Sequence, residues 1–165
     1  MARSMLGSVD QVAVVVRDLD ASMKRYVEEF DIGPWQVYTF GPDLLSKMTF
    51  RGEDRPYRMK LALADVGGTM YELIESVEGP NTYEEFLSEH GEGLHHFGYF
   101  VEDIDAAIRE MEGKGYKLLQ SGRGFGTQGD GAYAYFETES ALGCIAEAIE
   151  MPAEMPPPER TYPEQ

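Results

Sequence analysis

Two glutamates occupy corresponding positions in two similar segments of this chain, each among apolar neighbours. The run GTMYELIE at 68–75 resembles GCIAEAIE at 143–150, and the alignment superposes Glu72 on Glu147. Both segments have the pattern of a strand, in which alternate side chains share a face, so each glutamate would point the same way as apolar side chains. A carboxylate on such a face is costly to bury unless it is paired, hydrogen-bonded or bound to a metal.

A longer repeat adds two further polar residues. The stretch VDQVAVVVRDLDASMKRY at 9–26 reappears without a gap as LHHFGYFVEDIDAAIREM at 94–111, which superposes Gln11 on His96. Together with the glutamates, these residues offer one imidazole nitrogen and three oxygens. Such a set suits a hard to borderline divalent ion, such as Mn, Co, Ni, Zn or Mg, rather than a structural zinc site.

The same residues also have an ordinary structural interpretation. His96 could be a hydrogen-bonded core histidine, Gln11 an amide at a strand edge, and the two glutamates partners of arginines. The neighbouring His95 has the opposite strand parity, so we expect it behind a ligand or at the surface. The spacing alone leaves both interpretations open.

The elements that would position these residues follow the repeat. Each half is expected to run strand, helix, then three strands, with an amphipathic helix over 82–90 joining the halves. Two strands joined at Gly67 and Gly68 form a predicted hairpin. The residues from 152 onward hold five of the nine prolines and predict an extended or disordered tail. The expected strands are 9–16, 35–40 (continued by 47–50), 59–66, 70–76, 94–101, 116–121, 132–137 and 144–151.

Length and composition predict one globular domain. The chain has 165 residues, of which 42% are hydrophobic, and these suffice for a sizeable core. There is no apolar run of membrane-spanning length, and the first ten residues lack the apolar core of a secretory signal, so we expect a cytoplasmic protein. The single cysteine, Cys144, excludes an internal disulfide framework and cysteine-rich zinc motifs.

The charge balance argues against nucleic acid and membrane partners. The chain carries 30 acidic and 14 basic side chains, and its formal net charge of -16 repels polyanions. An anionic substrate such as a coenzyme A thioester would need a local basic patch. Two clusters could supply one, but a solvated, salt-bridged surface is the preferred interpretation. The clusters are Arg51, Arg55, Arg58 and Lys60, and Lys114, Lys117 and Arg123.

From 8 to 151 the chain resembles the vicinal oxygen chelate superfamily, which includes glyoxalase I, methylmalonyl-CoA epimerase, extradiol dioxygenases and bleomycin-resistance proteins. The resemblance lies in DQVAVVVRDLDASMKRY, MYELIE, GLHHFGYFVEDIDAAI and GCIAEAIE, and the third segment is most similar to epimerases. It implies an α+β fold in which two paired βαβββ modules, about 8–78 and 94–151, form a cupped mixed sheet. The domain would span 1–151, with a proline-rich tail at 152–165.

The resemblance also implies a ligand set. Position by position, the metal ligands would be Gln11, Glu72, His96 and Glu147. Gln11 departs from the histidine of epimerases, although some glyoxalase I enzymes use glutamine there, and it argues against an extradiol dioxygenase, which uses two histidines and one glutamate for iron. Epimerases place another acid on the preceding strand, near which this chain has Lys60, so a methylmalonyl-type substrate is not expected.

In the glyoxalase and epimerase branches the ion polarises a carbonyl while a carboxylate removes the adjacent proton. Glu147 is the first choice for that base, and Glu72 would act on the opposite face. The resemblance thus predicts a metal-dependent isomerase, epimerase or lyase, similar to lactoylglutathione lyase or an epimerase, that acts on a small carbonyl compound or thioester. The alternative is a metal-free protein that sequesters an aromatic or drug-like molecule in the same cup.

Aromatic side chains are expected to line the cup, although most aromatics in such a chain are ordinary core. The glycine-rich loop at 122–131 is expected to be a flexible hairpin. A sheet with exposed edges favours a homodimer. The predicted substrate-binding residues are Trp35, Tyr38, Tyr57, Phe125 and Tyr135, with Phe40 and Tyr133 as further candidates.

Overall fold

Two copies of one βαβββ unit make up most of the chain. The computed structural model describes residues 6–164; residues 1–5 of the predicted domain and residue 165 of the predicted tail lie outside this range. The first module comprises β1 (Gln11–Val15), α1 (Leu19–Phe30), β2 (Trp35–Phe40), β5 (Arg58–Val66) and β6 (Thr69–Glu78). The second comprises β7 (Gly93–Phe100), α3 (Ile104–Gly113), β8 (Leu118–Phe125), β9 (Gly131–Phe136) and β10 (Ile145–Glu150). The helix α2 (Thr82–His90) connects them.

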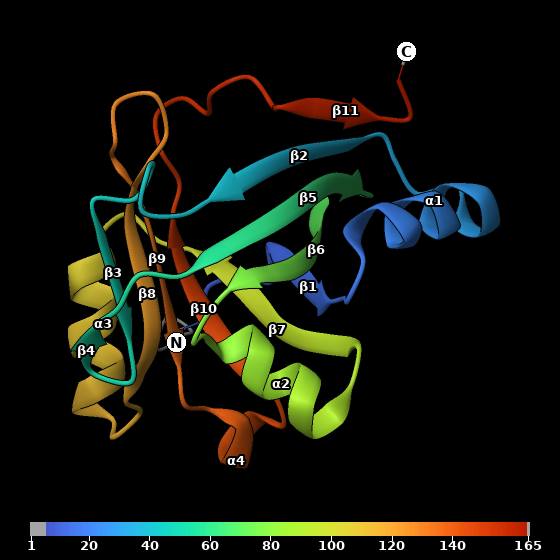
Figure 1. Cartoon of the computed structure of the whole chain (residues 1–165). Coiled ribbons are helices and arrows are strands. Elements are labelled where there is room, and N and C mark those ends of the chain that lie inside the picture. The colour runs from blue at the N-terminus through green and yellow to red at the C-terminus, as the bar shows by residue number, and fades with distance from the viewer. Residues whose placement is uncertain (1–5, 165) are drawn as a thin grey trace.

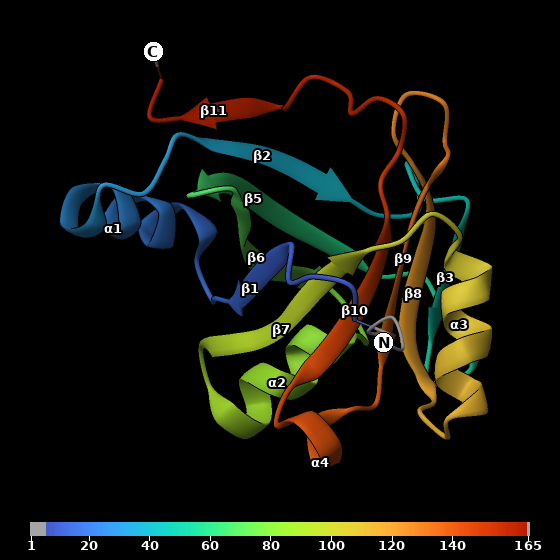
Figure 2. The same cartoon turned by 180° about the vertical axis from the view of Figure 1, so that it is seen from behind.

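The two modules join edge to edge in a single mixed sheet (Figures 1 and 2). β1 pairs with β7 antiparallel at the seam, and each of these strands pairs in parallel with the last strand of its own module, β6 or β10. The four strands in the middle of the order, β6-β1-β7-β10, therefore carry the four predicted ligands. The α+β architecture of paired modules expected from the repeat is confirmed.

The two repeats begin their helices in the same way. Asp18 and Asp103 each cap a helix by accepting a hydrogen bond from a backbone N–H in the first turn, of α1 and α3 respectively. Glu75 and Glu150, from β6 and β10, accept the first N–H of the same helices at 2.7 and 2.8 Å. These two acids lie on the helix-covered side of the sheet, so their strands' alternation directs Glu72 and Glu147 to the other side.

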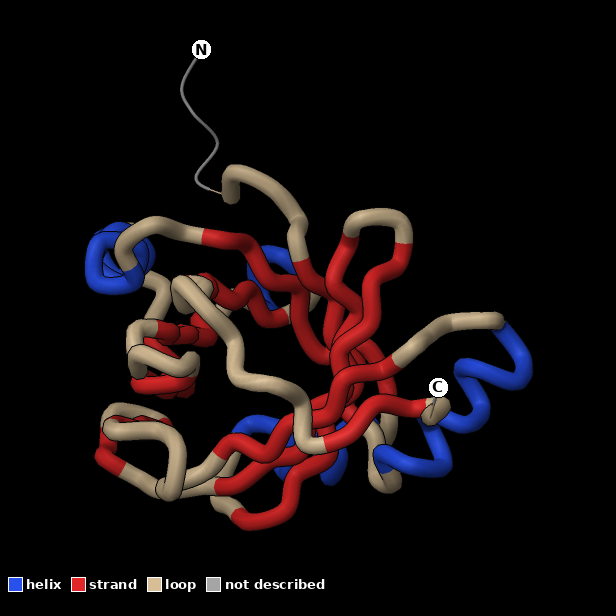
Figure 3. The backbone as a smooth tube through the Cα atoms, turned by 90° about the horizontal axis from the view of Figure 1, so that it is seen from above, coloured by secondary structure: helices blue, strands red, loops and turns tan. Residues whose placement is uncertain are grey.

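Each module also lends strands to the other module's outer edge. β3 (Lys47–Phe50) and β4 (Glu53–Asp54) follow β2 in sequence but attach to β8, whereas the sequence suggested that 47–50 would continue the strand 35–40. The tail returns as β11 (Arg160–Tyr162) and pairs with β2. We expected an extended or disordered tail, and Figure 3 shows it crossing over the strands before it adds to the sheet.

Apolar side chains pack on both sides of the sheet. One cluster fills the concave interior between the modules, and two smaller clusters lie beneath α1 and α3. A short helix absent from the sequence prediction, α4 (Glu139–Leu142), precedes β10. Among residues 6–164 the structure has no helix long and apolar enough to span a membrane.

Candidate metal centre

Four polar side chains converge inside the cup, one from each central strand. The Nε2 atom of His96 lies 3.0 Å from Glu147 Oε2, 3.5 Å from Glu72 Oε2 and 3.3 Å from Gln11 Oε1. Glu72, His96 and Glu147 each offer a ligand atom within 4.8 Å of the others, and all are buried. All four side chains come from one chain, and each module supplies two of them: Gln11 and Glu72 from the first, His96 and Glu147 from the second.

The polar contacts within this group leave one oxygen unsatisfied. Although His96 Nε2 lies 3.0 Å from Glu147 Oε2, this oxygen has no hydrogen-bond partner in the described part of the chain. Gln11 is oriented by its amide nitrogen, which donates to the sulfur of Met70 at 3.3 Å, so its carbonyl oxygen faces His96. A buried acceptor without a donor is costly, and here its free lone pair is available to a cation.

Burial and mutual charge shift the protonation of the group. Burial raises the pKa of Glu72, partly offset by the hydrogen bond and charge of His96. Burial would lower the pKa of His96, but Glu147 and Glu72 outweigh it and raise the pKa to about 9. The two carboxylates outnumber the single imidazole that can carry a positive charge. A divalent cation would neutralise both carboxylates while His96 binds it as a neutral imidazole.

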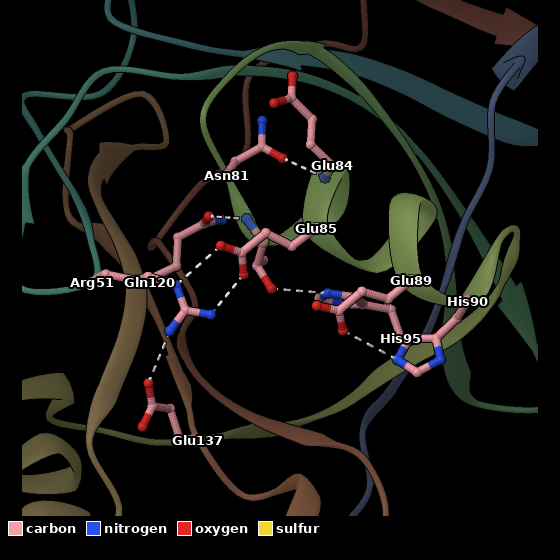
Figure 4. A network of polar contacts seen from close by, with 10 residues as sticks. Arg51, Asn81, Glu84, Glu85, Glu89, His90, His95, Gln120 and Glu137 are labelled. Atoms are coloured by element: carbon pink, nitrogen blue, oxygen red, sulfur yellow. Dashed lines mark hydrogen bonds and ion pairs between the residues drawn. The ribbon is translucent and has the colours of Figure 1, made fainter.

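A β-bulge supplies a partner behind His96. The pairing of β1 with β7 shifts register between Ala13 and Val14, which leaves His95 as the extra residue on β7. His95 is 1% exposed, and its Nδ1 lies 2.8 Å from Nδ1 of His96. Its Nε2 lies 3.2 Å from the hydroxyl of Thr82, at the start of α2. Figure 4 shows His95 beneath this helix.

This chain of contacts favours one tautomer of His96. If His96 donates from Nδ1 to His95, then its Nε2 keeps a lone pair directed at the carboxylates, and His95 donates from Nε2 to Thr82. Burial, followed by the charge of His96, lowers the pKa of His95 well below its ordinary value, so His95 stays neutral and can accept. The donor set, its burial and its tautomer therefore fit a divalent ion.

The cavity at this site is small and mostly apolar. It measures about 50 Å³, and its only charged lining residues among those described are Glu72 and Glu147. The predicted residues Phe125 and Tyr135 line it, together with Phe40 and Tyr133. The ring of Tyr135 packs against His96 with centroids 4.8 Å apart.

The other predicted aromatics lie elsewhere. Tyr38 lines an adjacent outer cavity rather than the inner one. Tyr57 is 1% exposed, and its hydroxyl contacts that of Tyr133 at 2.6 Å, so it supports the wall from behind. Trp35 packs in the cluster beneath α1, because the odd-numbered residues of β2 face that helix while Tyr38 faces the cup.

Sequence reasoning missed several residues that shape the site. Met155 in the tail lines the cavity, and Tyr83 of α2 bonds the hydroxyl of Tyr135 at 2.9 Å. Burial raises the pKa of Tyr83 and Tyr135 well above the ordinary value, so both phenols stay neutral. The tail lacks periodicity, and α2 shows only a helical pattern, so neither carried a signal of contact with the site.

The predicted basic clusters are largely engaged in ion pairs at the surface. Arg51 pairs with Glu85 at 2.7 Å and with Glu137 at 3.3 Å, as Figure 4 shows. Arg58 pairs with Asp43. Further pairs join Arg55 to Glu53, Lys114 to Glu110 and Arg123 to Asp105. The salt-bridged surface that we preferred from the sequence is therefore what the structure shows for these side chains.

The pKa of His96 predicts a pH-dependent stability of the metal-free protein. A folded-state pKa of about 9 exceeds the ordinary 6.5, so the folded state binds more protons between these values and its stability falls as pH rises. On the order of 3 kcal/mol would be present below pH 6.5 and lost through about pH 9. Glu72, whose folded pKa is also raised, acts in the same direction at lower pH.

The free energy of unfolding in urea, measured between pH 6 and 10 on protein freed of metal with a chelator, gives this loss of stability. A His96→Gln variant is the control. Because it lacks the titrating imidazole, its free energy of unfolding should not show the fall of about 3 kcal/mol between pH 6.5 and 9. Equal slopes for both proteins would contradict the charge sharing between His96 and the carboxylates.

Comparison with known proteins gives the family. Residues 10–136 match the model of the Glyoxalase/Bleomycin resistance protein/Dioxygenase superfamily. The fold is similar to methylmalonyl-CoA epimerase from Mycobacterium tuberculosis, at 21% identity and a TM-score of 0.67, over 92% of this chain and 93% of that one. A Streptomyces coelicolor methylmalonyl-CoA epimerase in complex with 2-nitronate-propionyl-CoA is similar at 18% identity and a TM-score of 0.65, over 88% and 97%. No curated protein sequence gives a significant match. The duplicated modules, the central ligand strands and the family match together establish that this chain belongs to the glyoxalase/bleomycin resistance protein/dioxygenase superfamily.

Proposed function

We propose that this protein is a metal-dependent isomerase, epimerase or lyase that removes a proton next to the carbonyl of a small carbonyl compound or thioester. The observation that carries the proposal is the buried group of Glu72, His96 and Glu147, in which Glu147 Oε2 has no hydrogen-bond partner among the described residues. A protein that only sequesters an apolar ligand gains nothing from burying two carboxylates, whose desolvation is costly. The group therefore favours an enzyme over a metal-free binding protein.

Gln11, Glu72, His96 and Glu147 would hold the ion, through three oxygens and one imidazole nitrogen. When bound, a divalent ion such as Zn, Co, Ni, Mn or Mg would draw electron density from the substrate carbonyl and lower the barrier to loss of the adjacent proton. His95 would keep His96 in the required tautomer.

Glu147 is the proposed base. Its carboxylate takes the proton as the C–H bond breaks, and the electron pair moves onto the carbonyl oxygen. Glu72 lies on the other side of His96 and would return or accept a proton on the opposite face, as an epimerase requires. The apolar walls around both carboxylates limit the access of bulk water, which strengthens the electrostatic interactions within the site.

Deuterium exchange tests this function directly. The full chain is stripped with chelator, reloaded with each candidate ion in turn, and incubated in D₂O with 1-hydroxy-1-phenylpropan-2-one or propionyl-CoA. We expect deuterium to enter the carbon next to the carbonyl of at least one compound, in proportion to bound metal measured by elemental analysis. The readout is the loss of the proton signal by NMR.

Two results would contradict the proposal. One is the absence of stoichiometric metal under every loading condition. The other is binding of an aromatic probe by the metal-free protein with no exchange in any metal-loaded form, which would support the sequestering alternative. Assignment as a lactoylglutathione lyase or an epimerase in particular, and homodimerisation, stay predictions.

A further inference from the structure

A second cavity, of about 500 Å³, lies against the metal-site cavity. The two cavities share Leu63, Met70, Met151 and Met155, which we call the methionine partition. The inner cavity measures about 50 Å³, which is room for a few water molecules rather than an organic substrate. A substrate must therefore approach the carboxylates from the outer cavity and displace part of this partition.

The partition is built to move and to contact apolar groups. Methionine side chains are unbranched and adapt to different partners, so those of Met151 and Met155 can make room while Met70 keeps its contact with the Gln11 amide. Met59 and Leu61 of β5 extend the same apolar wall further into the inner cavity. Lys60, between them in sequence, is exposed and belongs to the opposite face of the strand.

The tail holds its part of the partition in place. Met155 lies between two anchored stretches of the tail. On one side, Thr127 donates its backbone N–H to the tail at 3.0 Å and Asp130 accepts one from it at 2.9 Å. On the other side, Glu159 accepts the backbone N–H of Thr39 at 2.8 Å, just before β11. These contacts hold the backbone on both sides of Met155, so only its side chain has to move when a substrate enters.

The charged residues that line the two cavities indicate which substrates can enter. The described residues that line the two cavities include no lysine or arginine, and their only acidic side chains are Glu72, Glu147, Asp10 and Asp65. The arginines of the first predicted basic cluster are paired with carboxylates at the surface. Among these described residues, the only charged side chains that a phosphate-bearing ligand would meet in the cavities are thus acidic, in a chain whose formal net charge is -16.

We infer that the substrate is a neutral, apolar carbonyl compound and not a coenzyme A thioester. The apolar part would contact the methionine partition and lie in the outer cavity, and the carbonyl group would face Glu72 and Glu147. This inference rests on the proposed function for its reacting group. The lack of lysine and arginine among the described lining residues supports a neutral substrate, and the apolar walls support an apolar one.

Calorimetry on the metal-loaded full chain tests the inference with two probes, 1-hydroxy-1-phenylpropan-2-one and propionyl-CoA. We expect the neutral ketone to bind at least tenfold more tightly than propionyl-CoA. Equal or tighter binding of propionyl-CoA would overturn the inference. If propionyl-CoA bound as tightly and also exchanged its acyl proton for deuterium, the proposed function would stand and the inferred substrate class would be wrong. If the ketone bound more tightly but showed no exchange, the preference for a neutral ligand would stand and the proposed function would be contradicted.

Two substitutions separate packing from charge. Met155→Gln places an amide in the partition and should weaken ketone binding about fivefold or more, while Pro156→Ala, in the same tail but outside both linings, should leave it unchanged. Asp65→Lys, at the exposed β5–β6 hairpin, adds a cation to the lining of the outer cavity and should strengthen propionyl-CoA binding. Equal effects of Met155→Gln and Pro156→Ala on ketone binding would contradict the assigned route.

Discussion

Replacement of Glu147 by glutamine is expected to lower the rate of proton exchange by about 10²–10⁴-fold, the usual contribution of a positioned general base. The amide keeps the size of the carboxylate and still offers one oxygen, but it cannot accept the proton. Because Glu147 is buried among apolar side chains, water cannot easily reach the same position to replace it. The measurement is deuterium incorporation into substrate at saturating metal, with metal content determined on the same sample.

Glu150→Gln provides the matched control on the same strand. Glu150 points to the other side of the sheet and accepts the first N–H of α3, which a glutamine oxygen can still do. We expect exchange by this variant within about twofold of the unaltered protein. If Glu147→Gln kept full exchange and Glu72→Gln lost it, the base would be Glu72, and the assignment of the two carboxylates would be reversed.

Metal loading is expected to stabilise the fold substantially. An ion that binds only the folded chain adds about 3 kcal/mol at a free concentration one hundred times its Kd. In a domain of this size that corresponds to a rise in Tm of about 5–10 °C. The stabilisation arises because the ion neutralises Glu72 and Glu147 and gives Glu147 Oε2 the partner that it lacks among the described residues. Scanning calorimetry of chelated and reloaded protein measures it.

His96→Ala should abolish this stabilisation, because it removes the only nitrogen ligand of the set. It should also destabilise the metal-free protein by about 3–5 kcal/mol, since two buried carboxylates would lose their shared positive partner. His90→Ala is the control, because His90 lies exposed at the end of α2. A normal metal-induced rise in Tm for His96→Ala would show that the ion binds elsewhere.

The internal repeat made the central strands predictable and left the outer ones uncertain. Superposition of Gln11 on His96 and of Glu72 on Glu147 depends only on local alternation, which strand geometry preserves. The pairing of β3 with β8 joins segments far apart in sequence, and local patterns do not encode the partner of a distant edge strand. The same reason hid β11, whose residues show no periodicity at all.

The side of the sheet on which a single side chain lies was predictable only where side chains alternate regularly along the strand. His95 follows the expected position behind a ligand, but its contact with His96 depends on a bulge that the sequence does not announce. Trp35 was expected at the substrate site, yet the register of β2 turns it toward α1. For both residues, one position along the strand decides the face.

The exchanged strands β3, β4 and β11 have a consequence for how this protein folds and opens. The first module gives β3 and β4 to the second, and the chain that leaves the second module returns β11 to the first. Because of this exchange the two halves cannot separate by a hinge motion. Rotation of one half against the other must break the backbone hydrogen bonds between β3 and β8 and between β11 and β2. Folding is then expected to be slow and cooperative, with the four predicted ligands brought together only when both halves are complete.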